Sequence, residues 1–199
     1  MIMPKEKREI QKQDIMPLDV YIKNRKELRK NIVSFKKDRR IALGPYATFY
    51  FESYETMLAQ VQEMLYIEKG GDEQLKDELQ AYNPLIPNGK ELTATLMFEI
   101  DNPVSRSAFL SKVGGIEEKV FIKIDGEIAK AVPEKDVDRT SADGKASSVQ
   151  FIHFVLTDEQ IQKFKSKNID IELGVDHKDY SHTAKLSLEN INSLSADFN

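Results

Sequence analysis

The stretch GVDHKDYSH (174–182) contains two of the chain's three histidines, two aspartates and a tyrosine within nine residues. Imidazole and carboxylate groups at this spacing could bind Fe, Mn or Zn, or they could form an Asp–His pair for acid–base catalysis. A third interpretation is a polar turn in which Asp176 bonds to backbone amides. Asp176 and His177 converge on one ligand only if the chain bends sharply, because neighbouring residues of a strand point to opposite faces. All three interpretations stay open at this point.

Two other polar residues fall within apolar patterns. His153 lies in the strand pattern SVQFIHFVL, and we predict a hydrogen-bonded sheet histidine there rather than a metal ligand. Glu68 lies on the apolar face of a predicted helix (54–68), at the helix end where the dipole disfavours an anion. We expect its carboxylate to reach past the end of the helix into water.

The composition excludes several kinds of chemistry. The chain has no cysteine, which rules out disulfides, a thiol nucleophile, thiolate zinc and an iron–sulfur cluster ligated by cysteines of this chain. It has no G-x-S-x-G motif and neither of the glycine fingerprints that bind phosphate. Serine hydrolases and the common nucleotide-dependent enzymes are therefore disfavoured, while a metal bound by His177 and Asp176 remains an alternative.

Charge is unevenly distributed along the chain. The segment from Lys23 to Arg40 has nine Lys or Arg residues against Glu27 and Asp38, a local charge of +7 that leaves −11 for the rest of a chain whose net charge is −4. A basic segment on an acidic protein indicates nucleic acid, an acidic partner, or contact with the acidic surface of its own domain or of a twin subunit. Nucleic acid is the least favoured of these, because the segment lacks interleaved exposed aromatic residues and a known recognition motif.

The hydrophobic periodicity predicts a single α+β domain with helices mostly first and a largely antiparallel sheet second. Residues 1–13 are expected to form a frayed polar leader, 14–87 a helix-rich part and 88–199 a sheet-rich part. The first helix begins near Pro17 and docks through an apolar stripe; two more span 54–68 and 72–82. The stripe consists of Tyr21, Leu28, Ile32 and Phe35.

For the sheet-rich part, 88–199, the sequence predicts a mainly antiparallel sheet with short crossover helices. Asp125-Gly126 indicates a hairpin, and the alternation from Ile169 to Val175 indicates a strand with one buried face. Two strand–helix–strand units (93–125 and 148–175) resemble a split β-α-β arrangement. Apolar runs are far below the roughly 20 residues that span a bilayer, and the first residues contain no signal-peptide pattern, so we expect a cytoplasmic protein.

Five stretches together resemble the uncharacterised bacterial domain-of-unknown-function family three-five-zero-one, over about residues 14–180. They are MPLDVYIKNR, ALGPYATFYFESYETMLAQVQEML, YNPLIP, SSVQFIHFVL and GVDH. The resemblance implies a gene neighbourhood with rubrerythrin-like diiron proteins and iron–sulfur oxidoreductases, and hence a role in redox or peroxide handling. It also implies a candidate pocket formed by the polar positions that match the family pattern: Gln60, Glu63, Glu68, Tyr82, Asn83, Asp176, His177 and Tyr180. Lys178 stands where many relatives have proline.

These observations support three hypotheses. The leading one is a cytoplasmic accessory or binding protein that acts with a redox partner. The first alternative is a small metal-dependent or acid–base enzyme that uses His177 and Asp176 with Glu63 or Glu68. The second is nucleic-acid binding through the basic helix 23–40. We further predict that His177 is the histidine that faces a pocket, with polar groups of helix 54–68 beside it.

Overall fold

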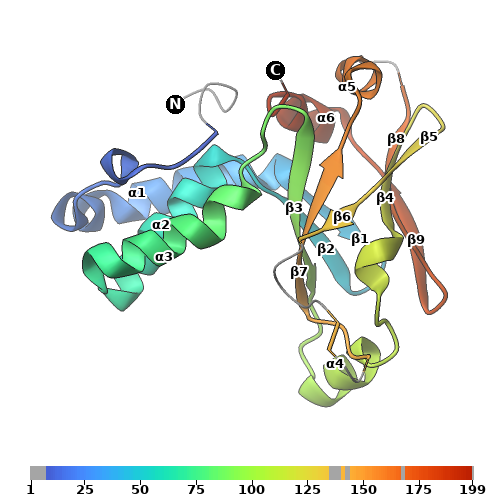
Figure 1. The fold of residues 1–199 in the computed structure, drawn as a ribbon, viewed down its shortest axis with the longest axis horizontal. Coiled ribbons are helices and arrows are strands. Elements are labelled where there is room, and N and C mark those ends of the chain that lie inside the picture. Colours follow the sequence, from blue (N-terminus) through green and yellow to red (C-terminus); the bar gives the residue numbers. More distant parts are fainter. Residues whose placement is uncertain (1–7, 135–139, 142–143, 167–168, 199) are drawn as a thin grey trace.

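The structure is a computed structural model that describes residues 8–134, 140–141, 144–166 and 169–198. In it, an arm of three helices projects from a sandwich of two antiparallel sheets (Figure 1). The arm consists of α1 (Leu18–Lys36), α2 (Tyr54–Glu68) and α3 (Gly71–Tyr82). The predicted α+β class is confirmed. No helix in the described ranges has the length and apolar character needed to cross a membrane.

The larger sheet, sheet A, has the strand order β1-β2-β3-β7-β6. Its strands are β1 (Arg40–Leu43), β2 (Ala47–Phe51), β3 (Glu91–Phe98), β7 (Val149–Val155) and β6 (Val132–Pro133). The smaller sheet, sheet B, has the order β5-β4-β8-β9. Its strands are β5 (Glu127–Lys130), β4 (Val120–Ile124), β8 (Ile171–His177) and β9 (Tyr180–Lys185). Short helices α4 (Pro103–Leu110), α5 (Asp158–Lys165) and α6 (Leu188–Ser195) connect or follow these strands.

The main core lies between the two sheets, because alternate residues of each strand point inward. Sheet A contributes Phe49, Leu96 and Phe154, and sheet B contributes Ile122 and Leu173, all fully buried. The alternation predicted for the strand that follows Ile169 is confirmed by the burial of Ile171, Leu173 and Val175. Burying these apolar faces against each other fixes the register of the strands.

The Asp125-Gly126 hairpin is confirmed. Ile124 pairs with Glu127 across the turn, and the two central residues have φ angles of 50° and 83°. Positive φ at both positions is the geometry of a type I′ turn, which matches the twist of the flanking strands. The dipeptide was therefore sufficient to predict both the turn and the β4–β5 pairing.

The split β-α-β arrangement is not formed. The unit 93–125 runs from β3 in sheet A to β4 in sheet B, and the unit 148–175 runs from β7 in sheet A to β8 in sheet B. Both helices therefore connect opposite layers of the sandwich instead of neighbouring strands of one sheet. The segment from β5 to β6 also changes layer, at the buried Ala131. Spacing along the chain could not show which sheet a strand would join.

The arm follows the predicted helix signals. α1 begins directly after Pro17, and α2 is capped by Ser53, whose hydroxyl accepts a hydrogen bond from the Thr56 N–H at 3.3 Å. α3 ends at Tyr82 as expected, although Asn83 keeps helical backbone angles and begins a 3-10 turn. A second apolar cluster lies beneath these helices and reaches Phe151 on the outer face of sheet A. It consists of Ile10, Tyr54, Met57, Val61, Leu75, Leu85 and Ile86.

The expected leader needs a correction. Residues 8–13 do not fray, because Ile10 is only 1% exposed within the second cluster; residues 1–7 lie outside the described ranges. Within the helix-rich part, 14–87, the stretch RRIALGPYATFYFES (39–53) predicts two strands separated by a Gly-Pro break, and these are confirmed as β1 and β2, which pair with each other and with β3 in sheet A. The chain thus enters the larger sheet before it completes the arm.

A buried ion pair joins the arm to the sandwich. The guanidinium of Arg39 pairs with the carboxylate of Asp197, and both side chains are 1% exposed. Arg39 also donates to the backbone oxygens of Phe51 at 3.1 Å, Glu52 at 2.7 Å and Ser193 at 3.1 Å. Burial raises the pKa of Asp197 to about 6, although Arg39 lowers it. One arginine therefore connects β2, α6 and the end of the chain.

Candidate functional site

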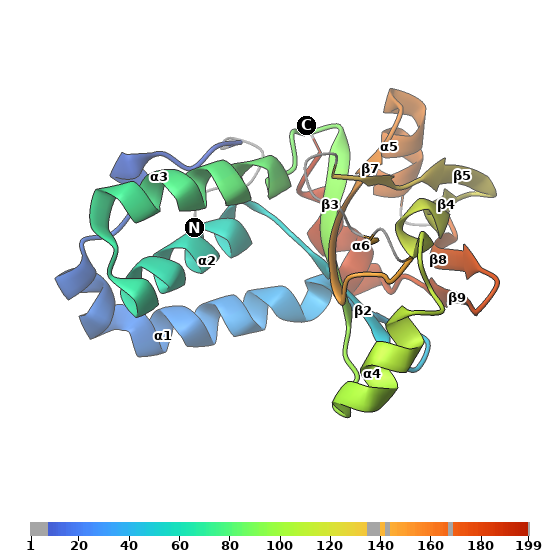
Figure 2. The same ribbon diagram turned by 60° about the horizontal axis from the view of Figure 1, so that its bottom comes forward.

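The eight candidate residues do not gather into one pocket. Asp176, His177 and Tyr180 lie in the hairpin of β8 and β9, and the other five lie in the arm. Figures 1 and 2 place the arm and this hairpin on opposite sides of sheet A. The physical reason is that the sandwich lies between them: the arm packs on the outer face of sheet A, while sheet B packs on its inner face.

The opening stretch GVDHKDYSH forms the end of a β-hairpin. His177 pairs with Tyr180 across a turn at Lys178-Asp179, and the Nδ1 atom of His177 accepts a hydrogen bond from the Asp179 N–H at 3.2 Å. His177 is 6% exposed, whereas Asp176 is exposed on the opposite face. The polar-turn interpretation therefore describes the geometry, with the histidine rather than Asp176 bonding to the backbone.

The chemical interpretations of this stretch receive no support from its geometry. Asp176 and His177 do not converge, so they form no acid–base pair. Among the residues that the structure describes, no group of three or more His, Asp or Glu side chains could bind a metal ion. The expectation that polar groups of helix 54–68 lie beside His177 is wrong, because sheet A lies between this hairpin and the arm.

Tyr180 and His182 connect β9 to the turn between β1 and β2. The Tyr180 hydroxyl donates to the Leu43 carbonyl and accepts from the Ala47 N–H at 3.0 Å. Burial raises the pKa of this hydroxyl. The His182 ring lies against Gly44, where an added Cβ would come within 2.5 Å of the ring. Both side chains thus stabilise the contact between the two sheets.

His153 behaves as predicted. Its Nδ1 atom lies 3.2 Å from a carboxylate oxygen of Glu91, on the neighbouring strand β3. Both side chains are mostly buried on the outer face of sheet A. A hydrogen-bonded sheet histidine is therefore confirmed.

In the arm, Glu63 docks α1 onto α2. Its carboxylate accepts a hydrogen bond from the Tyr21 hydroxyl at 2.6 Å and pairs with the guanidinium of Arg25. The hydrogen bond from Arg25 lowers the pKa of Glu63, and burial next to this carboxylate raises the pKa of Tyr21 to about 12. Arg25 also stacks over Tyr66, 4.4 Å from the ring centroid. Glu63 is thus fully engaged within the arm.

Gln60 and Tyr82 meet between α2 and α3, since the Gln60 amide donates to the Tyr82 hydroxyl at 3.4 Å. Glu68 is exposed at the end of α2 and accepts a hydrogen bond from Gln74 at 3.2 Å. This exposure is the outcome expected for a carboxylate that reaches past a helix end. Gln60, Tyr82 and Glu68 therefore lie in the arm without forming a chemical site.

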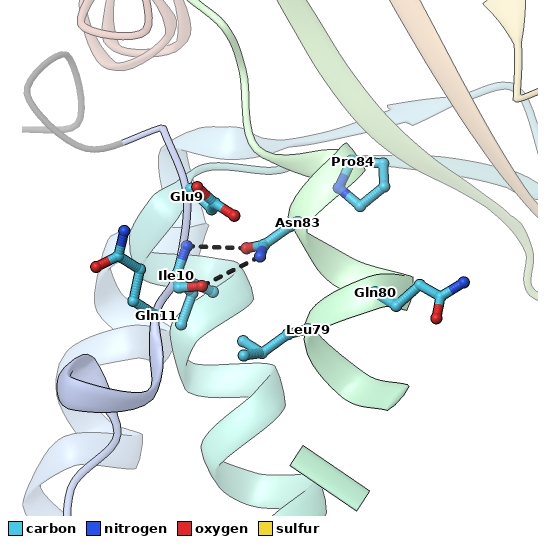
Figure 3. A pocket seen from close by; sticks show the side chains of 7 residues that line it. All are labelled: Glu9, Ile10, Gln11, Leu79, Gln80, Asn83 and Pro84. Atoms are coloured by element: carbon cyan, nitrogen blue, oxygen red, sulfur yellow. Dashed lines mark hydrogen bonds between the residues drawn. The ribbon is translucent and has the colours of Figure 1, made fainter. Parts of the chain in front are cut away.

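Asn83 bonds to both backbone groups of one residue. Its side-chain oxygen accepts from the Ile10 N–H at 2.8 Å, and its amide nitrogen donates to the Ile10 carbonyl at 3.1 Å (Figure 3). Gln62 makes the same pair of bonds to Met16, at 2.8 Å from the Met16 N–H and 3.2 Å to its carbonyl. We call these two interactions the amide clamps. Gln62 was not among the residues predicted from the sequence, because a polar residue beside the apolar stripe of a helix carries no stronger signal.

Two open hollows flank the segment bound by the amide clamps. One, of about 510 Å³, lies between residues 9–11 and the end of α3 (Figure 3). The other, of about 310 Å³, lies between residues 12–18 and the facing ends of α2 and α3. The candidate residue that lines the first hollow is Asn83. Both hollows therefore belong to the contact between the N-terminal segment and the arm.

The cations of the basic segment 23–40 fall into two groups. Arg25, Arg39 and Arg40 pair with carboxylates, namely Glu63, Asp197 and Glu99. The exposed cations Lys23, Lys26, Arg29, Lys30 and Lys37 form no ion pair with any residue that the structure describes. The expected contact with acidic surface of the same domain is thus made by three of the four arginines, whose planar fork suits carboxylates.

Two aliphatic residues lie among these exposed cations. Ile22 is 52% exposed and Val33 is 69% exposed. At 100° per residue, Ile22, Lys26, Arg29, Lys30 and Val33 fall on one side of α1. We call these five residues the cationic face. It is directed away from the stripe through which α1 docks, and Figure 2 shows α1 along an outer edge of the arm.

The family described as "Protein of unknown function (DUF3501)" matches residues 9–198. The chain belongs to this family. Among curated proteins, none matches this chain. A solved structure, described as a novel protein of unknown function from Burkholderia pseudomallei K96243, is similar with a TM-score of 0.89 and 33% sequence identity; the match covers 96% of this chain and 99% of that one. The DUF3501 resemblance found in the sequence is therefore confirmed, and it extends across both the arm and the sandwich.

Proposed function

We propose that this DUF3501 protein is a cytoplasmic accessory protein that binds an acidic, redox-active protein through the cationic face of α1. The observation that carries the proposal is the composition of this face, in which exposed Ile22 and Val33 lie among Lys26, Arg29 and Lys30. Cations attract an acidic surface and accelerate its approach, and exposed aliphatic residues supply the apolar contact that a protein interface buries.

The same composition favours a protein over nucleic acid as the partner. Phosphate backbones need cations alone, and bases of single strands stack on aromatic side chains, whereas the cationic face presents aliphatic side chains. The family resemblance adds the class of partner, a rubrerythrin-like diiron protein or an iron–sulfur oxidoreductase. In this role, the chain contributes a docking surface, and the partner contributes the redox chemistry.

A binding titration against a purified partner of each class tests the proposal. We expect saturable binding that weakens as the salt concentration rises, because exposed charges are screened. Lys26→Glu and Lys30→Glu together should weaken it at least about tenfold, since both attractions become repulsions. Lys112→Glu, a change at an exposed lysine beyond α4, is the matched control and should leave binding unchanged.

The aliphatic residues have their own control. Val33→Asp should weaken binding, whereas Val104→Asp, at a valine that is 78% exposed on α4, should not. No binding to either class of partner, or equal losses from the test and control variants, would contradict the proposal. Retardation of DNA or RNA that is lost in the Lys26→Glu/Lys30→Glu variant would instead support the nucleic-acid hypothesis.

A further inference from the structure

The segment 8–16 contacts the arm in the way that a bound peptide contacts a receptor. The two amide clamps bond only to its backbone, at Ile10 and Met16. A side-chain amide that engages both the N–H and the C=O of one residue reproduces one rung of a β-ladder. Such contacts recognise extended backbone whatever the side chain. Between the clamps, the segment makes one 3-10 turn, η2 (Lys12–Asp14).

Side-chain recognition involves a buried aliphatic residue and an arginine. Ile10 is 1% exposed and packs in the cluster formed by α2, α3 and the residues after α3. Two residues earlier, the Arg8 guanidinium donates to the backbone oxygens of Pro87 at 2.9 Å and Asp197 at 3.0 Å. The groove therefore selects an aliphatic residue preceded, two positions earlier, by an arginine.

In the rest of the segment, Ile15 packs, partly buried, against the same cluster. Gln11, Lys12 and Gln13 are exposed, and the ion pair of Lys12 with Asp72 lies on the surface, where such pairs stabilise weakly. The two hollows leave space on both sides of the backbone. A segment at the surface that is held by a few side chains and hydrogen bonds opens locally at lower cost than the core.

We propose that α2, α3 and residues 83–87 form a peptide-binding groove, and that the segment 8–16 is its ligand and exchanges between two copies of the chain. In this structure, the segment occupies the groove of its own chain. In the exchanged state, the groove is occupied by the same segment of a second copy. This segment has the same sequence, so it makes the same contacts with the groove. The amide clamps and the Ile10 pocket are identical in the two states, so exchange conserves every contact of the groove.

Energy transfer between labelled copies tests the proposal. The chain has no cysteine, so single introduced cysteines can be labelled selectively. One pool of protein carries a donor on the segment at Gln13→Cys, and the other carries an acceptor on α3 at Lys76→Cys. Both positions are exposed. After mixing, we expect energy transfer to appear with a concentration-dependent amplitude. An excess of a synthetic peptide with the sequence REIQKQDIMP should suppress it by filling the groove.

Two variants separate exchange through the groove from association elsewhere. Asn83→Ala removes two hydrogen bonds to the segment, both when the segment occupies its own groove and when it occupies the groove of a second copy. The variant should therefore raise the exchange rate about tenfold. Gln80→Ala, at an exposed residue that lies beside the same hollow and points away from the segment (Figure 3), should leave the rate unchanged. No transfer from micromolar to millimolar protein would overturn the proposal. So would transfer that neither the peptide nor Asn83→Ala affects, since the copies would then meet through another surface.

Discussion

The buried carboxyl of Asp197 makes stability depend on pH. Its pKa rises in the folded protein from the ordinary value of 3.8 to about 6, mainly because burial disfavours the charged form. Between these values the folded protein binds a proton that the unfolded chain does not. The stabilisation that this proton provides is complete below about pH 4 and is lost as the pH rises through 6.

Asp197→Asn, which cannot ionise, should reduce this dependence. Urea titrations at several pH values between 4 and 7 measure the free energy of unfolding. We expect the wild-type protein to lose, relative to the variant, on the order of 2 kcal/mol across this range. Glu68→Gln, at an exposed carboxylate, is the control and should follow the wild type. Parallel curves for the wild type and Asp197→Asn would show that the Arg39 pair keeps Asp197 ionised throughout.

Single residues were the hardest feature to predict from the sequence. Arg39 looked like one more cation of a basic run, although it is 1% exposed and bonds to three backbone oxygens. Its partner Asp197 lies 158 residues away, and no local pattern indicates a contact of that range. The same holds for Gln62 and Asn83, whose roles depend on the backbone of a segment that the sequence analysis treated as frayed.

At the scale of elements, the docking of α1 depends on apolar contact more than on charge. Leu28 is partly buried against the arm, whereas Lys26 is exposed. Leu28→Ala should lower the free energy of unfolding by about 1 kcal/mol, a fraction of the loss at a fully buried leucine. Lys26→Ala should change it by less than about 0.5 kcal/mol. Equal effects in a denaturant titration would mean that α1 does not dock through its apolar stripe.

The β1–β2 turn allows steric and backbone effects to be separated. Gly44 has a φ of +67° and faces the His182 ring, while Gly126 has a φ of +83° with open space around it. Gly126→Ala should cost about 1 kcal/mol, from backbone strain alone. Gly44→Ala should cost clearly more, because its Cβ meets the ring. In a His182→Ala background the excess should disappear; if it persists, the strain comes from the turn itself.

Elements were predicted well where local chemistry decides them. Helix and turn boundaries at Pro17, Ser53 and the Asp125-Gly126 pair follow from the backbone preferences of these residues, and the structure confirms each one. Asn83 is different, because it keeps helical backbone angles and continues into a 3-10 turn. The assignment of strands to sheets failed for the opposite reason. Whether β4 continues sheet A or starts sheet B depends on packing between layers. Periodicity along one strand carries no information about that packing.

At the scale of the whole molecule, Tyr180 bonds the edge of sheet B to the β1–β2 turn of sheet A. Tyr180→Phe should lower the free energy of unfolding by about 1–3 kcal/mol, since it leaves buried backbone groups of Leu43 and Ala47 without a partner. Tyr50→Phe is the matched control: its hydroxyl bonds to Glu99 at 2.8 Å at the surface, so its loss should be small. Equal losses in thermal or denaturant unfolding would contradict a stabilising role for this contact between the sheets.

The bonds from Arg8 to the backbone of Pro87 and Asp197 hold the two ends of the described chain close together. A short linker between the two ends would therefore produce a circular chain without distorting the fold. Closure would restrict the unfolded chain far more than the folded one and would stabilise the protein by that difference in entropy. New ends could then be opened at the solvent-exposed Lys178-Asp179 turn, giving a circular permutant in which the linker joins residue 198, part of the main core, to residue 8.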